Sequence, residues 1–307
     1  MKTMRFVLLG ALLAWLPVSA SRAEPLTVAT YNIENYTLAD RQVEGIHRKE
    51  YPKPEDAKAA LRMVIRRMNA DVLALQEVGG AAFLTELQRD LKREGLDYPY
   101  AVTMDAGEDK DRMTAVLSKR PLTGVTKHGD LAFKYFDGAQ KVKRGLLEVR
   151  VGGGAQTAGG AGGLGDVTIF VVHLKSRYTE RADDPNAALQ RAGEAVAVRD
   201  RVLKVFPEPA KDGFLIVGDF NDNRTSRPVR AVLARGDTPI SVWLPAADAR
   251  GEVWTHFFRK EDSYSRVDHI LVSPGLMPRV RGAAGRIEDS AEVGKASDHR
   301  PVVVVVE

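Results

Sequence analysis

Short apolar runs alternate with longer amphipathic segments along most of the chain. The short runs are rich in Val, Ile, Leu and Phe and are bounded by Gly, Pro, Asn or Asp, a pattern typical of buried strands. We expect strands at about 26–33, 71–76, 114–118, 144–151, 166–174, 213–218, 267–272 and 301–306. Apolar residues at helical spacing predict helices at about 54–68, 80–94, 186–205 and 225–235. Strands and helices interspersed without a clean linker predict one mixed α/β body.

Two further segments are predicted to be exposed loops. Residues 152–165 are Gly-rich and low in complexity, and they join two strand candidates, which favours a long, mobile hairpin loop. This segment lacks the Lys-Ser/Thr ending of a phosphate-binding P-loop. Residues 41–53 are basic and poor in aromatic residues, and this second loop could reach over a cleft.

The first 23 residues have the pattern of a secretory signal. Lys2 and Arg5 precede an apolar stretch at 6–18, and small residues follow, with Ala23 the favoured cleavage point and Ala20 the alternative. The apolar stretch is short for a membrane span, although an uncleaved anchor is the competing interpretation. We therefore expect a signal peptide at 1–23, one domain at 24–307 without an integral membrane segment, and a secreted or periplasmic protein.

Charge and cysteine content narrow the possible chemistry. Loss of Lys2, Arg5 and Arg22 with the signal would leave 45 − 3 = 42 basic residues against 41 acidic ones. A nearly neutral mature chain gives no independent support for a nucleic-acid partner. The chain has no Cys, which excludes disulfides, thiolate metal sites and Cys nucleophiles, so the fold depends on its own core.

Acidic side chains stand at the edges of four apolar runs. They are Glu77, Asp219, Asp268 and Asp298. A lone charge in such a place is costly to desolvate, and together the four could hold a divalent cation. Oxygen donors favour Mg²⁺, with Mn²⁺ or Ca²⁺ also suitable, and Asn32 adds a neutral oxygen. Taken singly, each of these residues could equally be a strand-edge cap or a turn former.

Two histidines occupy similar positions at strand edges, His173 and His299. Imidazole can accept a proton near neutral pH, and imidazolium can neutralise a phosphate, but each ring needs an orienting carboxylate. His269 follows Asp268 inside a strand and would face the opposite side, so we interpret it as structural. The remaining histidines have weaker settings: His47, His128 and His256.

Six short motifs occur in an order that resembles the endonuclease/exonuclease/phosphatase superfamily. They are ATYNIEN at 29–35, DVLALQE at 71–77, VHLKS at 172–176, VGDFN at 217–221, RVDHI at 266–270 and SDHRP at 297–301. Each motif alone is weak, whereas six in the right order are specific and cover essentially the whole mature chain. The resemblance implies the pancreatic deoxyribonuclease-like fold, an α/β four-layer sandwich of two packed mixed β-sheets flanked by helices.

The same resemblance implies hydrolysis of a phosphate ester with Mg²⁺. It makes Glu77 the principal metal ligand, assisted by Asn32 and Asp298. The residues that it implies for catalysis, in addition to the ligands, are His173, Asp219, Asn221, Asp268 and His299. In these roles Asp219 positions or deprotonates the attacking water, and Asn221 hydrogen-bonds the phosphoryl oxygens. His299, oriented by Asp268, contacts the scissile phosphate, and His173 lies on its other side.

Two further assignments are open. Arg144 begins a strand and could be the phosphate-contacting arginine of the superfamily, and Asp111 precedes a strand and could orient His173. Each could instead be an ordinary surface charge beside a strand. The chain lacks the disulfides of the secreted animal nuclease and the long extra helix-loop of abasic-site repair enzymes.

Three functions are compatible with these observations. The first is an exported Mg²⁺-dependent phosphodiesterase, acting as a monomeric nuclease on DNA or RNA. The second keeps the chemistry but acts on a phospholipid, as a sphingomyelinase or phospholipase C would, or on a small phosphoester. The third is a catalytically inactive binding scaffold, which the complete set of competent side chains disfavours.

Overall fold

The computed structural model describes residues 24–152 and 165–307. The expected signal peptide at 1–23 lies outside the described residues, as does most of the Gly-rich segment at 152–165. Within the described ranges, none of the helices has the length and apolar character needed to cross a membrane.

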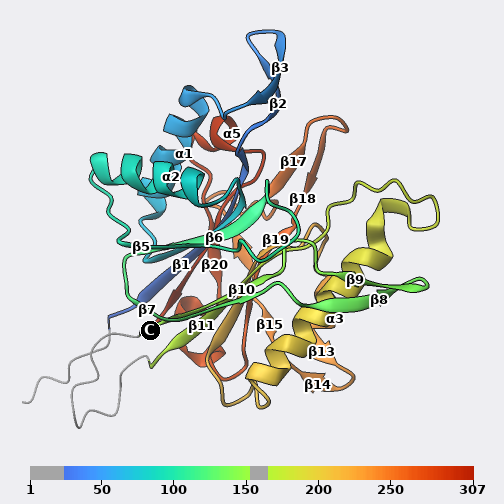
Figure 1. The fold of residues 1–307 in the computed structure, drawn as a ribbon. Coiled ribbons are helices and arrows are strands. Elements are labelled where there is room, and N and C mark those ends of the chain that lie inside the picture. Colours follow the sequence, from blue (N-terminus) through green and yellow to red (C-terminus); the bar gives the residue numbers. More distant parts are fainter. Residues whose placement is uncertain (1–23, 153–164) are drawn as a thin grey trace, which may run out of the picture.

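Two mixed β-sheets form the centre of the molecule (Figure 1). In spatial order, the strands of the first sheet in the described chain are β16 (Ala246–Ala247), β20 (Gly285–Ile287), β21 (Val302–Val306), β1 (Leu26–Tyr36), β4 (Val72–Val78), β6 (Met113–Ser118) and β5 (Tyr100–Thr103). Those of the second sheet are β15 (Val242–Trp243), β19 (Asp268–Val272), β12 (Phe214–Asp219), β11 (Val167–His173), β10 (Leu146–Val151) and β7 (Leu122–His128). The pairs β1–β4, β16–β20 and β11–β12 are parallel, and the other neighbouring strands of the two sheets are antiparallel.

Buried apolar side chains form three layers, one between the two sheets and one on the outer side of each sheet. The facing sides of the sheets share one buried cluster, which includes Val28, Leu147, Leu215 and Val304. The outer side of the first sheet packs on α1 (Glu55–Met68), α2 (Ala81–Arg93) and α5 (Val293–Ala296). The outer side of the second sheet packs on α3 (Ala188–Val205) and α4 (Arg227–Leu233). The predicted four-layer α/β sandwich is therefore confirmed.

Several short elements were not predicted. Segment 41–53, expected to be a loop, instead forms most of an exposed antiparallel hairpin of β2 (Ala39–Val43) and β3 (Ile46–Tyr51). Arg41 stabilises this hairpin, because its Nε donates to the Tyr51 carbonyl at 3.0 Å. Five strands of the two main sheets, β5, β7, β15, β16 and β20, and the short helix α5 are also unpredicted. So are the hairpins β8 (Ala132–Tyr135) with β9 (Gly138–Lys141) and β17 (His256–Phe258) with β18 (Ser263–Ser265), the two-residue strands β13 (Ala234–Arg235) and β14 (Thr238–Pro239), and 3-10 turns at Pro185–Ala187, Met277–Arg279 and Arg281–Ala283.

Candidate active site

Strand register brings distant motifs together at one edge of the sandwich. In the second sheet His173 pairs with Asp219, and Asp219 pairs with Asp268 on its other side. In the first sheet Asn32 on β1 pairs with Gln76 on β4, next to Glu77. The sheets meet here, since Asn32 Nδ2 donates to Asp219 Oδ2 at 3.1 Å.

Asp219 is the centre of this arrangement. Its carboxylate is buried, with side-chain exposure of 2 %, and it accepts hydrogen bonds from Asn32 and from both the backbone N–H (2.7 Å) and Nδ2 (3.2 Å) of Asn221. Burial raises the pKa of Asp219 to about 6, although the positive charge of His299 opposes the rise. Asp219 is therefore poised to exchange a proton near neutral pH.

The side chain of Asn221 is already engaged. Its Nδ2 group also donates to the Leu174 carbonyl at 2.9 Å, so both amide hydrogens have partners. Asn221 has φ of +52°, an uncommon value for a residue other than Gly, which turns the chain at the end of β12. Asn221 thus positions Asp219 in this structure, and its predicted bond to a phosphoryl oxygen would require one of these contacts to be exchanged.

His299 is held as an imidazolium. Its Nδ1–H donates to Asp268 Oδ2 at 2.8 Å, and its backbone N–H donates to Ser297 Oγ at 3.0 Å. Burial alone would lower the pKa of His299, but the buried carboxylate of Asp268, and then Asp219 and Asp298, raise it well above the usual value. Nε2 of His299 is left facing Asp219 Oδ2 at 4.0 Å. The expected His299–Asp268 pair is present.

His173 has the opposite electrostatic setting. Its Nε2 lies 3.6 Å from Asp219 Oδ2 and 4.0 Å from Glu77 Oε1, while its buried Nδ1 has no hydrogen-bond partner. Burial, and after it the nearby Arg144 guanidinium, lowers the pKa of His173 well below the usual value. His173 is therefore neutral beside a charged His299.

The expectation that Asp111 orients His173 is wrong. Asp111 is exposed, and it is Asp109 that lies inside, where it accepts the backbone N–H groups of Asp111 and Arg112 at 3.3 and 3.1 Å. This turn directs Asp111 outward. Asp109 binds Arg144 Nε at 3.0 Å, so the acid on this loop neutralises an arginine and not a histidine.

Arg144 is a buried residue of the site and not a surface charge. Its Nη1 donates to the Leu174 carbonyl at 3.3 Å, the same oxygen that binds Asn221. Beneath it, the buried carboxylate of Glu194 accepts the backbone N–H groups of Lys143 (3.0 Å) and Lys175 (2.6 Å). Glu194 joins two loops of the site. No sequence pattern predicts this role, because Glu194 lies in the middle of an amphipathic helix.

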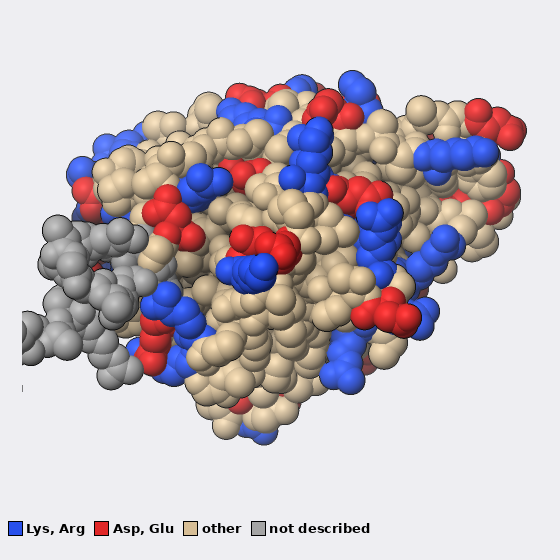
Figure 2. All heavy atoms as spheres, turned by 90° about the horizontal axis from the view of Figure 1, so that it is seen from below, with Lys and Arg blue, Asp and Glu red and all other residues tan. Residues whose placement is uncertain are grey.

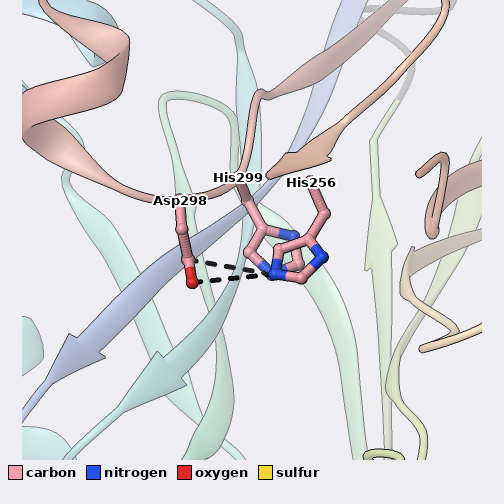
Figure 3. A group of neighbouring side chains, drawn as sticks. All are labelled: His256, Asp298 and His299. Atoms are coloured by element: carbon pink, nitrogen blue, oxygen red, sulfur yellow. Dashed lines mark ion pairs between the residues drawn. The ribbon is translucent and has the colours of Figure 1, made fainter. Parts of the chain in front are cut away.

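His256 is a neighbour of the site, although its position in the sequence is a weaker indication than those of His173 and His299. It lies on β17, and an isolated antiparallel bridge pairs it with His299. Its Nε2 is 3.7 Å from Asp298 Oδ2, while His299 Nε2 is 3.9 Å from Asp298 Oδ1 (Figure 3). The only sequence signal was its place in an aromatic run at 254–258 shortly before the Asp268 strand.

The contacts of His269 support its structural interpretation. Its Nε2–H donates to the Asp222 carbonyl at 2.9 Å, and its Nδ1 accepts from Trp243 Nε1 at 3.1 Å. Burial lowers the pKa of His269 to about 4, so the ring is neutral, and both of its nitrogens have hydrogen-bond partners.

Comparison with known proteins identifies the family. A model of the Endonuclease/Exonuclease/phosphatase family matches residues 29–299. The chain belongs to this family. Its members are hydrolases of phosphoesters that typically depend on a divalent metal ion. No curated protein matches the sequence.

Solved structures share the fold of this family member at low sequence identity. A Staphylococcus aureus beta toxin variant with bound magnesium ions is 15 % identical, with 92 % of this chain and 100 % of that one covered and a TM-score of 0.61. The human Nocturnin catalytic domain with bound sulfate is 17 % identical, with coverages of 93 % and 95 % and a TM-score of 0.60. Sphingomyelinase C from Streptomyces griseocarneus is 18 % identical, with coverages of 92 % and 100 % and a TM-score of 0.56.

The oxygen donors at Glu77 fit the divalent ion that the family uses. β4 is irregular between Leu75 and Val78, and Glu77 has φ of +67°, so its side chain leaves the alternation of the strand. Glu77 Oε2 accepts the Asn35 N–H at 2.7 Å, and the carboxylate is 17 % exposed. Asn32 Oδ1 accepts only from the Glu34 N–H, at 3.1 Å, and retains a free lone pair. Carboxylate and amide oxygens suit Mg²⁺, and the role of Asp298 as a third ligand stays a prediction.

Proposed function

We propose that this protein is an exported, divalent-metal-dependent phosphodiesterase that cleaves nucleic acid, DNA or RNA. The observation that carries the proposal is a group of three basic side chains on the His173 side of the site, Lys143, Arg144 and Lys175, of which Arg144 is paired with Asp109. Burial lowers the pKa of Lys175 to about 8, and repulsion from Arg144 and Lys143 acts in the same direction. The same Arg144 lowers the pKa of His173. Cations that repel one another beside a hydrolytic centre favour a substrate with several phosphates.

The geometry supports a division of labour between the ionisable groups. Asp219, with a pKa of about 6, accepts the proton of the attacking water. The imidazolium of His299 stabilises the charge that develops on the phosphoryl oxygens, and Asp268 holds it in place. Neutral His173 offers Nε2 on the other side of Asp219, 3.6 Å away.

Glu77 and Asn32, with Asp298 as the predicted third ligand, would hold the metal ion. A bound Mg²⁺ would polarise the phosphoryl oxygen and lower the cost of charge on the leaving oxygen. The side chains of this chain bind, orient and exchange protons around it.

Charge at the surface also supports a nucleic acid over a membrane. The face seen in Figure 2 has Lys, Arg, Asp and Glu interspersed around a broad uncharged area, with no large patch of one sign among the described residues. The tip of the β17–β18 hairpin, which borders the site, is charged and exposed: Arg259, Lys260, Glu261 and Asp262. A charged tip is poorly suited to enter a bilayer. Export is proposed from the pattern of residues 1–23 and is tested by N-terminal sequencing of protein recovered from the periplasm or medium.

The test compares plasmid DNA, RNA, sphingomyelin vesicles and bis-p-nitrophenyl phosphate, each with Mg²⁺ and with chelator. We expect nucleic-acid cleavage that chelator abolishes and that a Glu77→Ala/His299→Ala double variant lacks. His47→Gln, a change on the exposed β2–β3 hairpin, serves as the histidine control. Release of choline phosphate from sphingomyelin without cleavage of nucleic acid would reverse the proposed substrate. Undiminished cleavage by the double variant would show that Glu77 and His299 are not part of the active site.

The contribution of the positive charge can be separated from the chemistry. Lys143 is half-buried on the His173 side, whereas Lys211 is exposed and pairs with Glu208 elsewhere. Lys143→Ala should lower kcat/KM on oligonucleotides and reduce the salt slope by about 1, because one phosphate contact is lost. Lys211→Ala should change neither. An equal loss on the small ester bis-p-nitrophenyl phosphate would contradict a role in binding several phosphates.

A further inference from the structure

Three metal-binding donor atoms converge at the outer side of the candidate active site. His256, Asp298 and His299 each offer one ligand atom, and these atoms lie within 4.8 Å of one another (Figure 3). His256 comes from β17, while Asp298 and His299 come from the segment before β21. This group adds two imidazole nitrogens to Asp298, which is also the predicted third ligand beside Glu77 and Asn32.

The distances in this group suit a shared ion better than direct hydrogen bonds. His256 Nε2 is 3.7 Å from Asp298 Oδ2, and His299 Nε2 is 3.9 Å from Asp298 Oδ1. Both separations are longer than an N–H···O hydrogen bond. Two ligands at about 2.1 Å from a tetrahedral zinc ion are about 3.4 Å apart, so each of these two His–Asp separations is within a few tenths of an ångström of that spacing.

The backbone holds the three side chains in place. His256 and His299 face each other across an antiparallel bridge, and the Phe257 N–H donates to the Asp298 carbonyl at 3.0 Å. The Arg300 N–H donates to the Thr255 carbonyl at 2.6 Å. The main chain that carries the three donors is therefore held by hydrogen bonds on both sides, which limits the backbone entropy that a ligand must remove.

The surroundings of the histidines match those of protein zinc sites. Nδ1 of His299 donates to Asp268 at 2.8 Å, and such a carboxylate behind a histidine fixes the ring with Nε2 directed at the metal. The side chains of His256 and Asp298 are 21 % and 31 % exposed, which gives an ion access from solvent. Two imidazoles and one carboxylate favour zinc-like ions, whereas Mg²⁺ prefers oxygen ligands alone.

We propose that His256, Asp298 and His299 form a binding site for Zn²⁺, and that an ion bound there inhibits the enzyme by occupying Nε2 of His299. The inhibitory part rests on the function proposed above, whereas the binding part does not. Zn²⁺ displaces the proton of His299 Nε2, which is released to solvent. His299 Nε2 can then no longer stabilise the phosphoryl oxygens, and Asp298 is drawn from the predicted Mg²⁺ site, whereas Glu77 and Asn32 are not ligands of the Zn²⁺ ion.

The binding test uses Zn²⁺ alone as the probe. Untagged protein in excess Mg²⁺ is titrated with Zn²⁺ by calorimetry, and the visible absorption of added Co²⁺ reports the nitrogen and oxygen coordination. Wild type should bind one ion. His256→Gln should bind it at least about tenfold more weakly, because it removes a ligand. His47→Gln is the matched control, since His47 is also beside an aspartate, at 3.9 Å from Asp40, and should bind as wild type does.

The activity test asks whether that ion inhibits. With Mg²⁺ saturating, Zn²⁺ should inhibit wild type and His47→Gln at the concentration that binds, and His256→Gln should need at least about tenfold more. His256→Asn provides a second variant, and thermal unfolding shows that both variants remain folded. Equal Zn²⁺ affinity in wild type and His256→Gln would overturn the proposed site.

The two proposals fail in different ways. If no phosphoester is cleaved but His256→Gln loses the bound Zn²⁺, the metal site stands and the proposed function falls. If nucleic acid is cleaved and Zn²⁺ inhibits wild type and His256→Gln alike, the function stands and the inhibitory site falls.

Discussion

The pair of Asp268 and His299 allows the sharpest test of the site. Asp268 is fully buried on β19, and its Oδ2 accepts the Nδ1–H of His299 at 2.8 Å. Burial disfavours the imidazolium of His299 and would lower its pKa. The negative charge of Asp268 is the largest of the opposing effects, and together these raise the pKa of His299. Asp268→Asn keeps the size of the side chain and removes its charge.

The expected effect follows from the energy of this contact. A hydrogen bond between charged groups contributes about 1.5–3 kcal/mol, and one pH unit corresponds to about 1.4 kcal/mol. An amide at this position can also donate to neutral Nδ1, which favours the uncharged ring. The midpoint of the alkaline limb of activity should therefore move down by about 1–2 pH units. The maximal rate should fall by about 10²-fold or more, because His299 loses its orientation.

The sign of this change is fixed by the direction of the pKa shift. A histidine whose pKa is raised is charged at neutral pH and loses its proton only as the pH rises through that pKa. Wild type should thus keep its activity to higher pH than Asp268→Asn. The assay is kcat/KM against pH on bis-p-nitrophenyl phosphate, with an NMR titration of the His299 ring as an activity-independent readout. Asp97→Asn, which removes an exposed charge paired with Lys92, is the control. An alkaline limb that stays in place in Asp268→Asn would refute the role of the pair.

Three further predictions address the metal, the proton acceptor and the core. Glu77→Gln should weaken Mg²⁺ binding by at least about tenfold in calorimetry, with activity partly restored by excess Mg²⁺; unchanged binding would place the ion elsewhere. Activity should fall as pH drops through about 6, because Asp219 must be ionised. The variant Asp219→Asn should be inactive. Its free energy of unfolding should nevertheless rise on the order of 1–3 kcal/mol at neutral pH, since a buried acid with a raised pKa destabilises the fold when charged. A lower stability of that variant would contradict the burial argument. Leu215→Ala, in the fully buried layer between the sheets, should lower the free energy of unfolding by about 2–5 kcal/mol in urea titrations without changing the pH profile; a loss below 1 kcal/mol would contradict tight packing there.

The long apolar runs predict the central strands of the fold, whereas the polar hairpins cannot be predicted from the sequence. A run such as the five valines at 302–306 can only be accommodated inside a sheet, so its position follows from composition. β17 and β18 have three residues each and mix Ser, His and aromatic side chains, and such segments carry no periodic signal. The polar composition of segment 41–53 predicts a loop, yet cross-strand pairs and Arg41 make it a hairpin.

The candidate site was predictable wherever a polar residue directly ends a buried strand. Asn32, Glu77, His173 and Asp219 are carried to one edge by the register of strands that the sequence predicts. The positions of residues that are set by turns or by long-range bridges do not follow from strand register, so the sequence does not predict them. Asp109 and Asp111 differ only in which way a turn directs them.

His173 and His299 show how one fold can give identical side chains opposite roles. Both rings are buried and both have Nε2 within 4.0 Å of Asp219 Oδ2, so burial and the shared carboxylate cannot distinguish them. What differs is the second neighbour, since His299 has Asp268 at 2.8 Å while His173 has the cation Arg144 nearby and an Nδ1 without a partner. Opposite charges on the two flanks therefore hold one ring protonated and the other neutral, on either side of an acid with a pKa of about 6. Such a centre has a proton acceptor, a fixed positive charge and a neutral imidazole in place before any substrate arrives, which is the preorganisation that hydrolysis of an anionic ester requires.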